Sequence, residues 1–323
     1  YMIKILLLFG GNSYEHNISC KSAKNIIENI DNNKFDLTMV GIDKCNNWYI
    51  FDDNLCYLDN GNWLNGNIKK IDNVVKFIKG YDKVFSIIHG NDGENGNLEG
   101  LFQLCNVKYV GSDLLASAIS YDKEFTKIIC KDYELPQVEY EVLRKNDKTH
   151  TNIGYPLVVK PSKGGSSLGI HVCNNKKEFV KHVKEAFLYD DKVIIEKYVK
   201  AREFECAILD CGKRIISKVG EIVSINTIYD YEAKYVKDSK LLIPANISKN
   251  LERKIRNYSD MIFNILGLSD LARVDFLYDY NNDILYFNEV NTLPGFTAIS
   301  MYPKLIENMG ISYKNLITKL LMN

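Results

Sequence analysis

Apolar and polar residues alternate in blocks along the N-terminal third of the chain, and the blocks predict a parallel sheet flanked by helices. Short apolar runs typical of buried strands cover residues 3–9, 36–42, 84–88 and 107–110. A helical pattern over residues 19–29 follows the first run and its two glycines. Between residues 43 and 71 the chain is rich in Asn, Asp and Gly, which indicates a hairpin or a long loop.

A second block begins near Asp122 and contains a glycine-rich loop at residues 164–169. Around this loop we expect strands at 155–160, 170–173 and 193–196 and a helix at 176–189. From Glu203 onward the strands lengthen and alternate, as in an antiparallel sheet. We therefore predict an α/β fold, with α+β character in its C-terminal part, divided into domains of residues 1–121, 122–202 and 203–323.

Composition narrows the classes of function. The 323 residues suffice for two or three domains, and 41 basic residues balance 41 acidic ones without a long basic run, so a nucleic-acid partner is not indicated. The apolar residues 2–9 are too few for a signal core or a membrane span. Eight cysteines occur without a CxxC pair, which favours free buried thiols in a reducing cytoplasm over disulfides or zinc ligands.

Candidate metal ligands occur near the C-terminus, in two strands that we expect to be neighbours. Alternation places Arg273 and Asp275 on one face of the first strand, and Glu289 and Asn291 on one face of the second. Two carboxylates and an amide oxygen suit a hard divalent cation such as Mg²⁺, which usually bridges to substrate phosphates. The arginine among them indicates that the bound ligand is itself anionic.

Glycine-rich segments supply candidate anion sites. Lys160 precedes the loop GGSSLG, whose glycines let backbone N–H groups approach a phosphate, although a mobile hairpin loop with a solvated lysine is the alternative. His89 and Glu15 each follow an expected strand, at the edge where open α/β sheets bind ligands. A structural histidine and a plain helix-terminal charge are the alternatives. The segment YDYEAKY at 229–235 fits either an active-site loop or a surface loop.

The order of these segments resembles that of the ATP-grasp enzymes, and within them that of the D-alanine–D-alanine ligases. The resemblance covers nearly the whole chain, through GGNSYEHNIS, HGNDGENG, YDKEFTK, VVKPSKGGSSLG, IIEKYV, EFECAIL, YDYEAKY, ARVDF and FNEVNTLPGFTAISMYP. It implies a Rossmann-like pre-ATP-grasp domain, a two-part ATP-grasp fold and a homodimer. A Rossmann dehydrogenase is disfavoured because GxGxxG does not occur after the first strand.

The resemblance also implies that ATP lies between the central and C-terminal domains. Lys123 and Lys160 would contact its phosphates. The backbone of Glu196, Lys197 and Val199 would bind the adenine, and Glu203 would bind the ribose. The implied ligands of two Mg²⁺ or Mn²⁺ ions are Asp275, Glu289 and Asn291.

The implied reaction joins two D-alanines for peptidoglycan and cell-wall synthesis. ATP phosphorylates the carboxylate of one D-alanine, and the amine of the second displaces phosphate from this acyl phosphate. Arg273 and the N–H of Gly295 would steady the oxyanion, and Lys234 would reach the transferred phosphate. The resemblance gives a hydrogen-bonded trio of Glu15, Ser166 and Tyr235. The implied substrate-binding residues are Glu15, His89, Arg273, Gly295, Ser300 and Met301.

Two positions depart from the family pattern. Asn95 replaces the acid of the usual GEDG, and Gly164 stands where many relatives carry an acid. The intact EAKY at 232–235 favours a D-amino acid over D-lactate as second substrate, and leaves D-Ala-D-Ser or another carboxylate–amine ligation as the alternative. A non-catalytic nucleotide-binding regulator would be expected to lose Arg273 or a metal ligand, and this chain keeps them.

Overall fold

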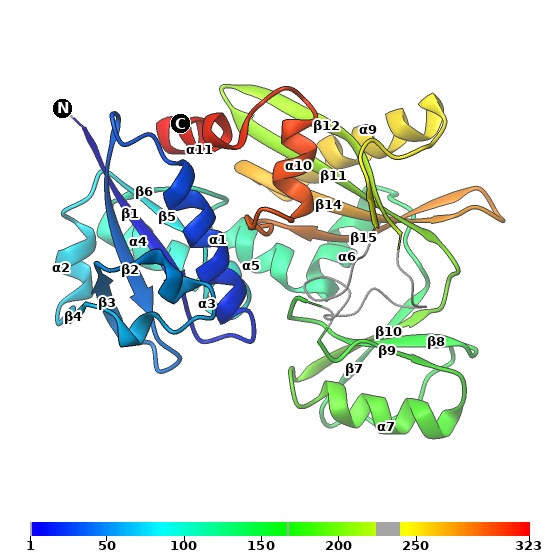
Figure 1. Cartoon of the computed structure of the whole chain (residues 1–323). Helices are drawn as coiled ribbons and strands as arrows, with labels where there is room; N and C mark the ends of the chain where they lie inside the picture. Colours follow the sequence, from blue (N-terminus) through cyan, green and yellow to red (C-terminus); the bar gives the residue numbers. More distant parts are fainter. Residues whose placement is uncertain (1, 167, 224–239) are drawn as a thin grey trace.

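The computed structural model describes residues 2–166, 168–223 and 240–323, which form three sheets with their covering helices (Figure 1). The first sheet has the order β4–β3–β2–β1–β5–β6. Its strands are β1 (Ile3–Gly10), β2 (Phe35–Ile42), β3 (Trp48–Phe51), β4 (Ile68–Lys70), β5 (Lys83–Ser86) and β6 (Lys108–Tyr109). The apolar runs predicted as parallel strands are confirmed, since β2, β1, β5 and β6 pair in parallel.

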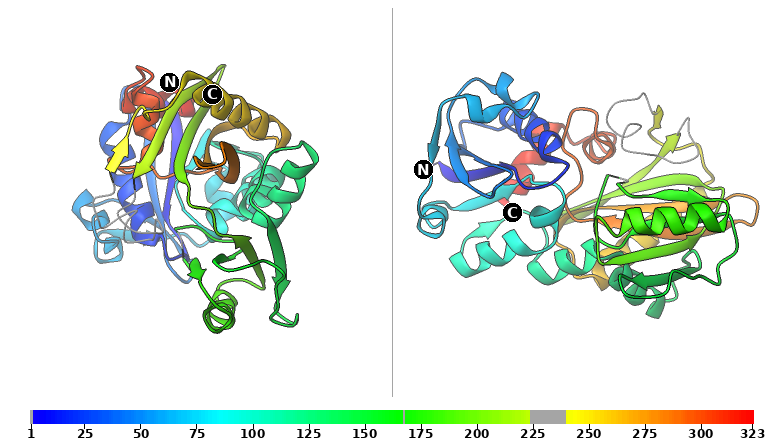
Figure 2. Two further views of the ribbon diagram at one scale, coloured as in Figure 1. Left: turned by 90° about the vertical axis from the view of Figure 1, so that its right-hand side faces the viewer. Right: turned by 90° about the horizontal axis from the view of Figure 1, so that it is seen from below.

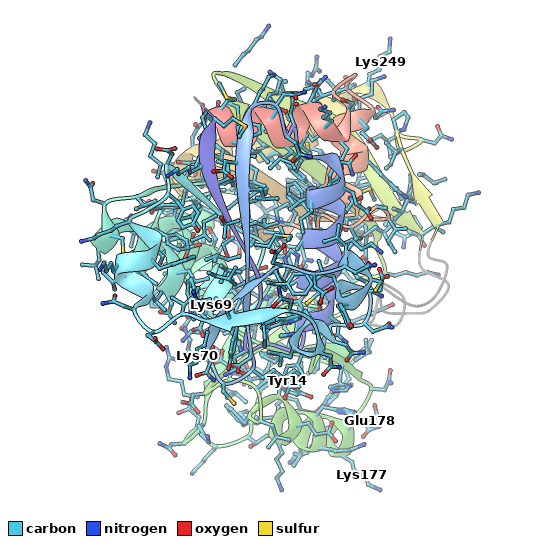
Figure 3. All side chains as sticks on the ribbon, turned by 60° about the vertical axis from the view of Figure 1, so that its left-hand side comes forward. Tyr14, Lys69, Lys70, Lys177, Glu178 and Lys249 are labelled. Carbon is cyan, nitrogen blue, oxygen red and sulfur yellow. The ribbon has the colours of Figure 1, made fainter. Side chains whose placement is uncertain are left out.

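The segment between residues 43 and 71 extends this sheet. Strands β3 and β4 form an antiparallel pair, so the predicted hairpin is present, with a long connection that carries two 3₁₀ turns, Leu55–Leu58 and Trp63–Asn65. Trp63 is fully buried against Phe9, at 5.4 Å between ring centroids. At the outer edge, Lys69 and Lys70 of β4 point into solvent (Figure 3). Charged side chains on an edge strand discourage pairing with other chains.

Helices cover both faces of the first sheet. They are α1 (His16–Asn29), α2 (Val74–Ile78), α3 (Asn91–Glu94) and α4 (Asn97–Cys105). Helix α5 (Leu114–Tyr121) follows them and packs toward the third sheet, where Ala116 joins the apolar core. Helix α1 begins earlier than its sequence pattern indicated, because His16 is tied into the fold: its ring accepts a hydrogen bond from the indole N–H of Trp63 at 3.1 Å.

The second sheet is antiparallel, with the order β7–β10–β8–β9. Its strands are β7 (Tyr140–Arg144), β8 (Leu157–Pro161), β9 (His171–Cys173) and β10 (Lys192–Lys197), and its helices are α6 (Lys123–Asp132) and α7 (Lys176–Ala186). Helix α7 lies across one face of the sheet (Figure 2). Phe179 and Val183 of α7 fill a separate apolar core with Val159 and Val193.

The third sheet is antiparallel, as predicted, with the order β13–β12–β11–β14–β15. Its strands are β11 (Arg202–Cys211), β12 (Lys213–Val223), β13 (Lys240–Leu242), β14 (Asp270–Asp279) and β15 (Ile284–Asn291). The helices of this part are α9 (Lys249–Ile265), α10 (Met301–Glu307) and α11 (Tyr313–Met322).

The first and third sheets share one apolar core through the last helix. Leu316 and Leu320 of α11 are fully buried in the cluster that contains Ile5 and Leu7 of β1. Lys83 of β5 donates from its ammonium group to the carbonyl of Leu320 at 2.7 Å. The C-terminal helix therefore closes one face of the N-terminal sheet (Figure 1).

The eight cysteines are all free, as predicted, but Cys45 and Cys56 are exposed, which corrects the expectation that all of the thiols are buried. Within the described ranges, every helix is too short or too polar to cross a lipid bilayer.

Candidate active site

A pocket lies between the second and third sheets. Strands β8, β9 and β10 form one wall, and β11, β14 and β15 form the other. The residues that line it are Val138, Val158, Lys160, Ile170, Val172, Glu196, Lys197, Tyr198, Val199, Glu203, Phe204, Glu205, Ile222, Asp275, Phe276, Leu277, Asn288 and Glu289. Apolar side chains together with charged groups suit a ligand that has a flat apolar part and an anionic part.

A buried carboxylate in the pocket wall holds two lysines, of which Lys160 also lines the pocket. Glu196 of β10 is 4% exposed, and its two oxygens lie 2.7 Å from Nζ of Lys127 and 2.8 Å from Nζ of Lys160. Burial alone would raise the pKa of Glu196, but the two ammonium charges outweigh it and lower the pKa to about 2. The side chain of Glu196 thus anchors lysines, which leaves only its backbone to contact a ligand.

The backbone that the resemblance assigns to adenine binding is partly used by the fold. The N–H of Lys197 donates to the carbonyl of Glu139 at 3.0 Å, and the N–H of Tyr198 donates to that of Pro156 at 3.1 Å. Val199 and Glu203 line the same pocket as Lys197. The structure therefore brings these predicted residues together.

Lys123 connects the glycine-rich loop to the third sheet. Its Nζ donates to the carbonyl of Gly164 at 2.8 Å and lies 3.4 Å from Oε2 of Glu289. The start of α6 is held in place because the backbone N–H of Lys123 donates to the carbonyl of Ser162 and the hydroxyl of Ser162 donates to Asp122. The ammonium group of Lys123 is therefore fixed beside the predicted phosphate loop.

The glycine-rich loop contacts the start of α1 through Glu15. The hydroxyl of Ser166 donates to the carboxylate of Glu15, and Ser166 adopts a positive φ of 53°. A side-chain carbon on Gly90 or Gly165 would lie 3.0 or 3.1 Å from the same carboxylate, so glycine leaves the space that Glu15 needs. Next to Glu15, the ring of Tyr14 contacts that of Tyr189, at 5.9 Å between centroids.

The predicted metal ligands meet Arg273 on adjacent strands. Asp275 of β14 pairs in register with Glu289 of β15, and Arg273 pairs with Asn291. Arg273 donates two hydrogen bonds to Asp275, at 2.8 and 2.7 Å, and Asn291 donates to the same carboxylate at 3.0 Å. The shared faces predicted from alternation are confirmed.

A further carboxylate holds the arginine from the neighbouring strand. Oε2 of Glu205 in β11 lies 2.9 Å from Nε of Arg273. Burial would lower the pKa of Arg273, but the charges of Asp275 and Glu205 raise it well above its ordinary value. The guanidinium is therefore permanently charged and fixed in orientation.

His89 lies in a buried hydrogen-bonded chain that reaches the turn after β15. Its Nε2 is 3.1 Å from the hydroxyl of Ser22, which also accepts the backbone N–H of Phe296 at 3.4 Å. Phe296 directly follows Gly295. The structure thus places His89 close to the predicted oxyanion glycine, although the two are far apart in sequence.

The residues predicted to hold the second substrate follow the same turn. The hydroxyl of Ser300 accepts the N–H of Thr297 at 3.1 Å. Met301 is 5% exposed, and its thioether packs against Gly220, so only its backbone faces the turn. Lys234 and Tyr235 lie outside the described residues.

Sequence reasoning missed two groups at this site, Lys127 and Glu205. Lys127 lies four residues after Lys123 on α6, a spacing that places both on one helix face. Glu205 lies two residues after Glu203 on β11, so that both point to one side of the strand. These spacings were the available signals.

Two antiparallel sheets that enclose a pocket lined by lysines and carboxylates are the arrangement of the ATP-grasp class of enzymes. Family models described as "D-ala D-ala ligase N-terminus" and "D-ala D-ala ligase C-terminus" match residues 4–112 and 129–322. The chain belongs to the D-alanine–D-alanine ligase family.

Similar proteins cover the chain almost end to end. The D-alanine–D-alanine ligase of Caldicellulosiruptor bescii is 38% identical over 99% of this chain and 94% of its own length. D-alanine–D-alanine ligase B of Clostridium tetani is 40% identical, over 99% and 92%.

Solved structures of ligases are also similar to the chain over almost its whole length. The VanG D-Ala:D-Ser ligase from Enterococcus faecalis superposes with a TM-score of 0.90 at 32% identity, covering 100% of this chain and 99% of its own. The D-alanine–D-alanine ligase from Coxiella burnetii gives a TM-score of 0.82 at 30% identity, with 99% and 93% covered.

Proposed function

We propose that the chain joins two D-alanines into D-alanyl-D-alanine with ATP, through an acyl phosphate, and so supplies a precursor of peptidoglycan. The observation that carries the proposal is the pocket in which Lys160 faces Asp275 and Glu289 from the opposite wall. ATP would lie there, with its phosphates near Lys123 and Lys160. Membership of the ligase family supports the same activity.

The donor set at the carboxylate wall fits magnesium or manganese. Asp275, Glu289 and Asn291 offer two carboxylates and an amide oxygen, the ligands that hard divalent cations prefer. We propose that they hold two such ions, which when bound neutralise the charge of the phosphates. Asp275 would be shared between a cation and Arg273, which already donates to both of its oxygens.

Positioning and charge carry the chemistry, because phosphoryl transfer requires little covalent work from the protein. A carboxylate oxygen of the first D-alanine attacks the terminal phosphorus of ATP and ADP leaves. The amine of the second D-alanine then attacks the carbonyl carbon, and phosphate leaves as the C–O bond breaks. Arg273 and the N–H of Gly295 would stabilise the oxyanion, at about 3 kcal/mol per donor.

The first D-alanine would lie beside Glu15 and His89, and the carboxylate of the second beside Ser300 and the backbone of Met301. Lys234 and Tyr235 lie outside the residues that the structure describes. Lys234 is proposed to reach the transferred phosphate, and Tyr235 to join the hydrogen bond between Glu15 and Ser166. The buried position of His89 supports a part in orienting the substrate.

The test is phosphate release from ATP with D-alanine as the sole amino acid, compared with L-alanine and with D-lactate. The proposal expects release with D-alanine and a dipeptide in equal amount. Release without D-alanine, or no release with it, would contradict the proposal.

A second candidate product is D-alanyl-D-serine, because the VanG D-Ala:D-Ser ligase is among the similar structures. One added hydroxyl is a small difference for an apolar pocket to reject. Mass spectrometry of products formed from equal amounts of D-alanine and D-serine separates the two. We expect D-alanyl-D-alanine to predominate.

Use of ATP and a cell-wall precursor as product supports the cytoplasm as the location. We also propose a homodimer, on the basis of the family resemblance. Light scattering coupled to gel filtration would test the assembly state, with a single-chain mass as the contrary result.

A further inference from the structure

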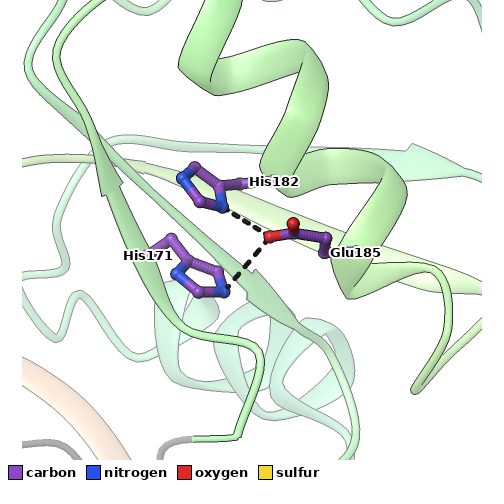
Figure 4. Close-up of side chains that lie close together, drawn as sticks. All are labelled: His171, His182 and Glu185. Atoms are coloured by element: carbon purple, nitrogen blue, oxygen red, sulfur yellow. Dashed lines mark hydrogen bonds and ion pairs between the residues drawn. The ribbon is translucent and has the colours of Figure 1, made fainter.

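Two histidines and a glutamate meet on the outer side of the second sheet (Figure 4). Nδ1 of His182 lies 2.7 Å from Oε2 of Glu185, and Nε2 of His171 lies 3.7 Å from the same oxygen. The two imidazole rings are stacked, with centroids 4.1 Å apart and planes at 16°. One potential ligand atom from each of the three side chains lies within 4.8 Å of the other two. Among the residues that the structure describes, no other group of three or more His, Cys, Asp or Glu side chains meets this condition.

The local fold brings the three side chains together. His182 and Glu185 are three residues apart on α7, and so lie on one face of the helix. His171 is in β9, which joins α7 through two residues, and Asn175 caps the helix by accepting the N–H of Glu178. Alternation along β9 directs His171 toward α7, whereas Val172 lines the nucleotide pocket on the other side.

We propose that His171, His182 and Glu185 bind a divalent transition-metal ion of the zinc type. Imidazole nitrogens with one carboxylate favour zinc, nickel or copper over magnesium or calcium. Ligand bonds of about 2.0 to 2.2 Å in a tetrahedral site bring the ligand atoms to roughly 3.3 Å from one another. The observed separations of 2.7 and 3.7 Å from Oε2 of Glu185 bracket this spacing, and one imidazole would turn out of the stack so that both ring nitrogens face the ion.

The surroundings are compatible with such an ion. His182 is 16% exposed, whereas His171 and Glu185 are 37% and 38% exposed, so an ion can enter from solvent and keep water at an open position. Lys181, 3.8 Å from Oε1 of Glu185, is the competing cation, but it is 67% exposed and free to move into solvent.

The ion would fasten β9 to α7 behind the nucleotide pocket. Strand β9 begins just after the glycine-rich loop at residues 164–169, and Val172 is part of the pocket wall. Metal binding is therefore expected to stiffen this wall. Amide hydrogen exchange of the peptide that covers β9 should slow when the ion binds.

Zinc titration by calorimetry tests the proposal. Exposed Cys45 and Cys56 are competing zinc ligands, so the parent protein carries Cys45→Ser and Cys56→Ser, and excess Mg²⁺ occupies the oxygen-rich site. We expect one equivalent of zinc to bind. His171→Gln or His182→Gln should weaken binding by at least about tenfold, since even the partners of metal ligands are typically worth that much. His150→Gln, which changes an exposed histidine outside the cluster, is the matched control and should bind as the parent does.

Cobalt provides a second readout. A Co²⁺ complex of the parent should show the visible absorption of a low-coordinate site, and Glu185→Gln should lose it while its amide keeps a hydrogen bond to His182. Equal zinc affinity in the parent and both histidine variants would overturn the proposal. So would a parent that binds no zinc, or identical cobalt spectra in the parent and Glu185→Gln.

Discussion

Nζ of Lys127 lies 2.7 Å from Oε1 of Glu196, and both side chains are almost fully buried. Lys160 contacts the second oxygen of the same carboxylate at 2.8 Å. One acid therefore fixes two lysines that come from a helix and from a strand. Because Lys160 is a proposed phosphate ligand, the geometry of the proposed nucleotide pocket depends on this buried cluster.

Glu196→Gln should destabilise the protein and weaken ATP binding. The substitution leaves two buried ammonium groups without their counter-charge, which typically costs about 3–5 kcal/mol of unfolding free energy. Urea denaturation measures this loss. Glu139→Gln, at an exposed position beside β7, is the control and should change stability by less than about 0.5 kcal/mol.

The difference in stability between wild type and Glu196→Gln should depend on pH. The pKa of Glu196 is about 2 in the fold, against an ordinary value of 4.5. A lowered pKa means that the stabilisation is complete above 4.5 and is lost as the pH falls toward 2. The stability difference between wild type and Glu196→Gln should therefore shrink below about pH 4.5. A constant difference down to acid unfolding would be evidence against the charge pairing.

Arg273→Lys should lower turnover far more than it weakens ATP binding. Lysine keeps the positive charge between Glu205 and Asp275 but loses the two parallel hydrogen bonds of the guanidinium. Loss of an oxyanion donor typically reduces kcat by about 100-fold to 1,000-fold. Phosphate release gives kcat, and equilibrium dialysis gives the Kd for ATP.

Arg214→Lys is the matched control for that change. Arg214 of β12 pairs with Asp210 of β11 and with Asp260 of α9, and none of the three lines the pocket. We expect its kcat to stay near that of wild type. Unchanged turnover in Arg273→Lys would remove Arg273 from the proposed chemistry.

Glu289→Gln should raise the Mg²⁺ concentration needed for half-maximal activity. The amide supplies one neutral oxygen where the carboxylate supplies a charged one, so cation binding weakens. Asp283→Asn, in the loop before β15, is the control, because Asn tolerates its positive φ of 55°. Superimposable Mg²⁺ titrations of wild type and Glu289→Gln would speak against its part as a metal ligand.

Glu99→Gln should stabilise the protein, but only at neutral and higher pH. Burial, with a contribution from Glu94, raises the pKa of Glu99 to about 7 from an ordinary 4.5, and its Oε2 has no hydrogen-bond partner among the described residues. Because this pKa is raised, the contribution of Glu99 to stability is most favourable below pH 4.5 and is lost as the pH rises through 7. The gain should reach about 2–3 kcal/mol at pH 8 and vanish near pH 4.5.

Thermal unfolding at several pH values measures this gain. Glu28→Gln, at an exposed position on α1, should show no such trend. If Glu99→Gln were equally stable relative to wild type at pH 5 and pH 8, the proposed cost of ionising Glu99 would be wrong.

The local pattern of apolar and polar residues was sufficient to predict those helices and strands whose faces are clearly buried or clearly exposed. Strand β1 is apolar on both faces and was predictable as a buried parallel strand. Strand β7 was missed because YEVLR, at a sheet edge, has three half-buried positions, one buried and one exposed, and so no clear alternation. The early start of α1 depends on the contact of His16 with Trp63, a tertiary interaction that no local pattern encodes.

The site was predictable where alternation along one strand decides it, and less so where separate elements meet. Arg273 and Asp275 were assigned to one face because they are two residues apart. The ion pair between Lys127 and Glu196 joins a helix to a strand far along the chain, so its partners could not be matched from spacing. The triad of His171, His182 and Glu185 likewise forms only when β9 packs on α7.

The burial of Leu316 and Leu320 against Ile5 and Leu7 has a consequence for synthesis on the ribosome. The N-terminal sheet emerges first, yet one of its faces receives its final cover only when α11 has left the exit tunnel. During elongation that face carries exposed apolar side chains, which makes nascent chains prone to association. A nonsense codon before residue 313 would therefore be expected to yield an insoluble product, even though the proposed catalytic residues are all present.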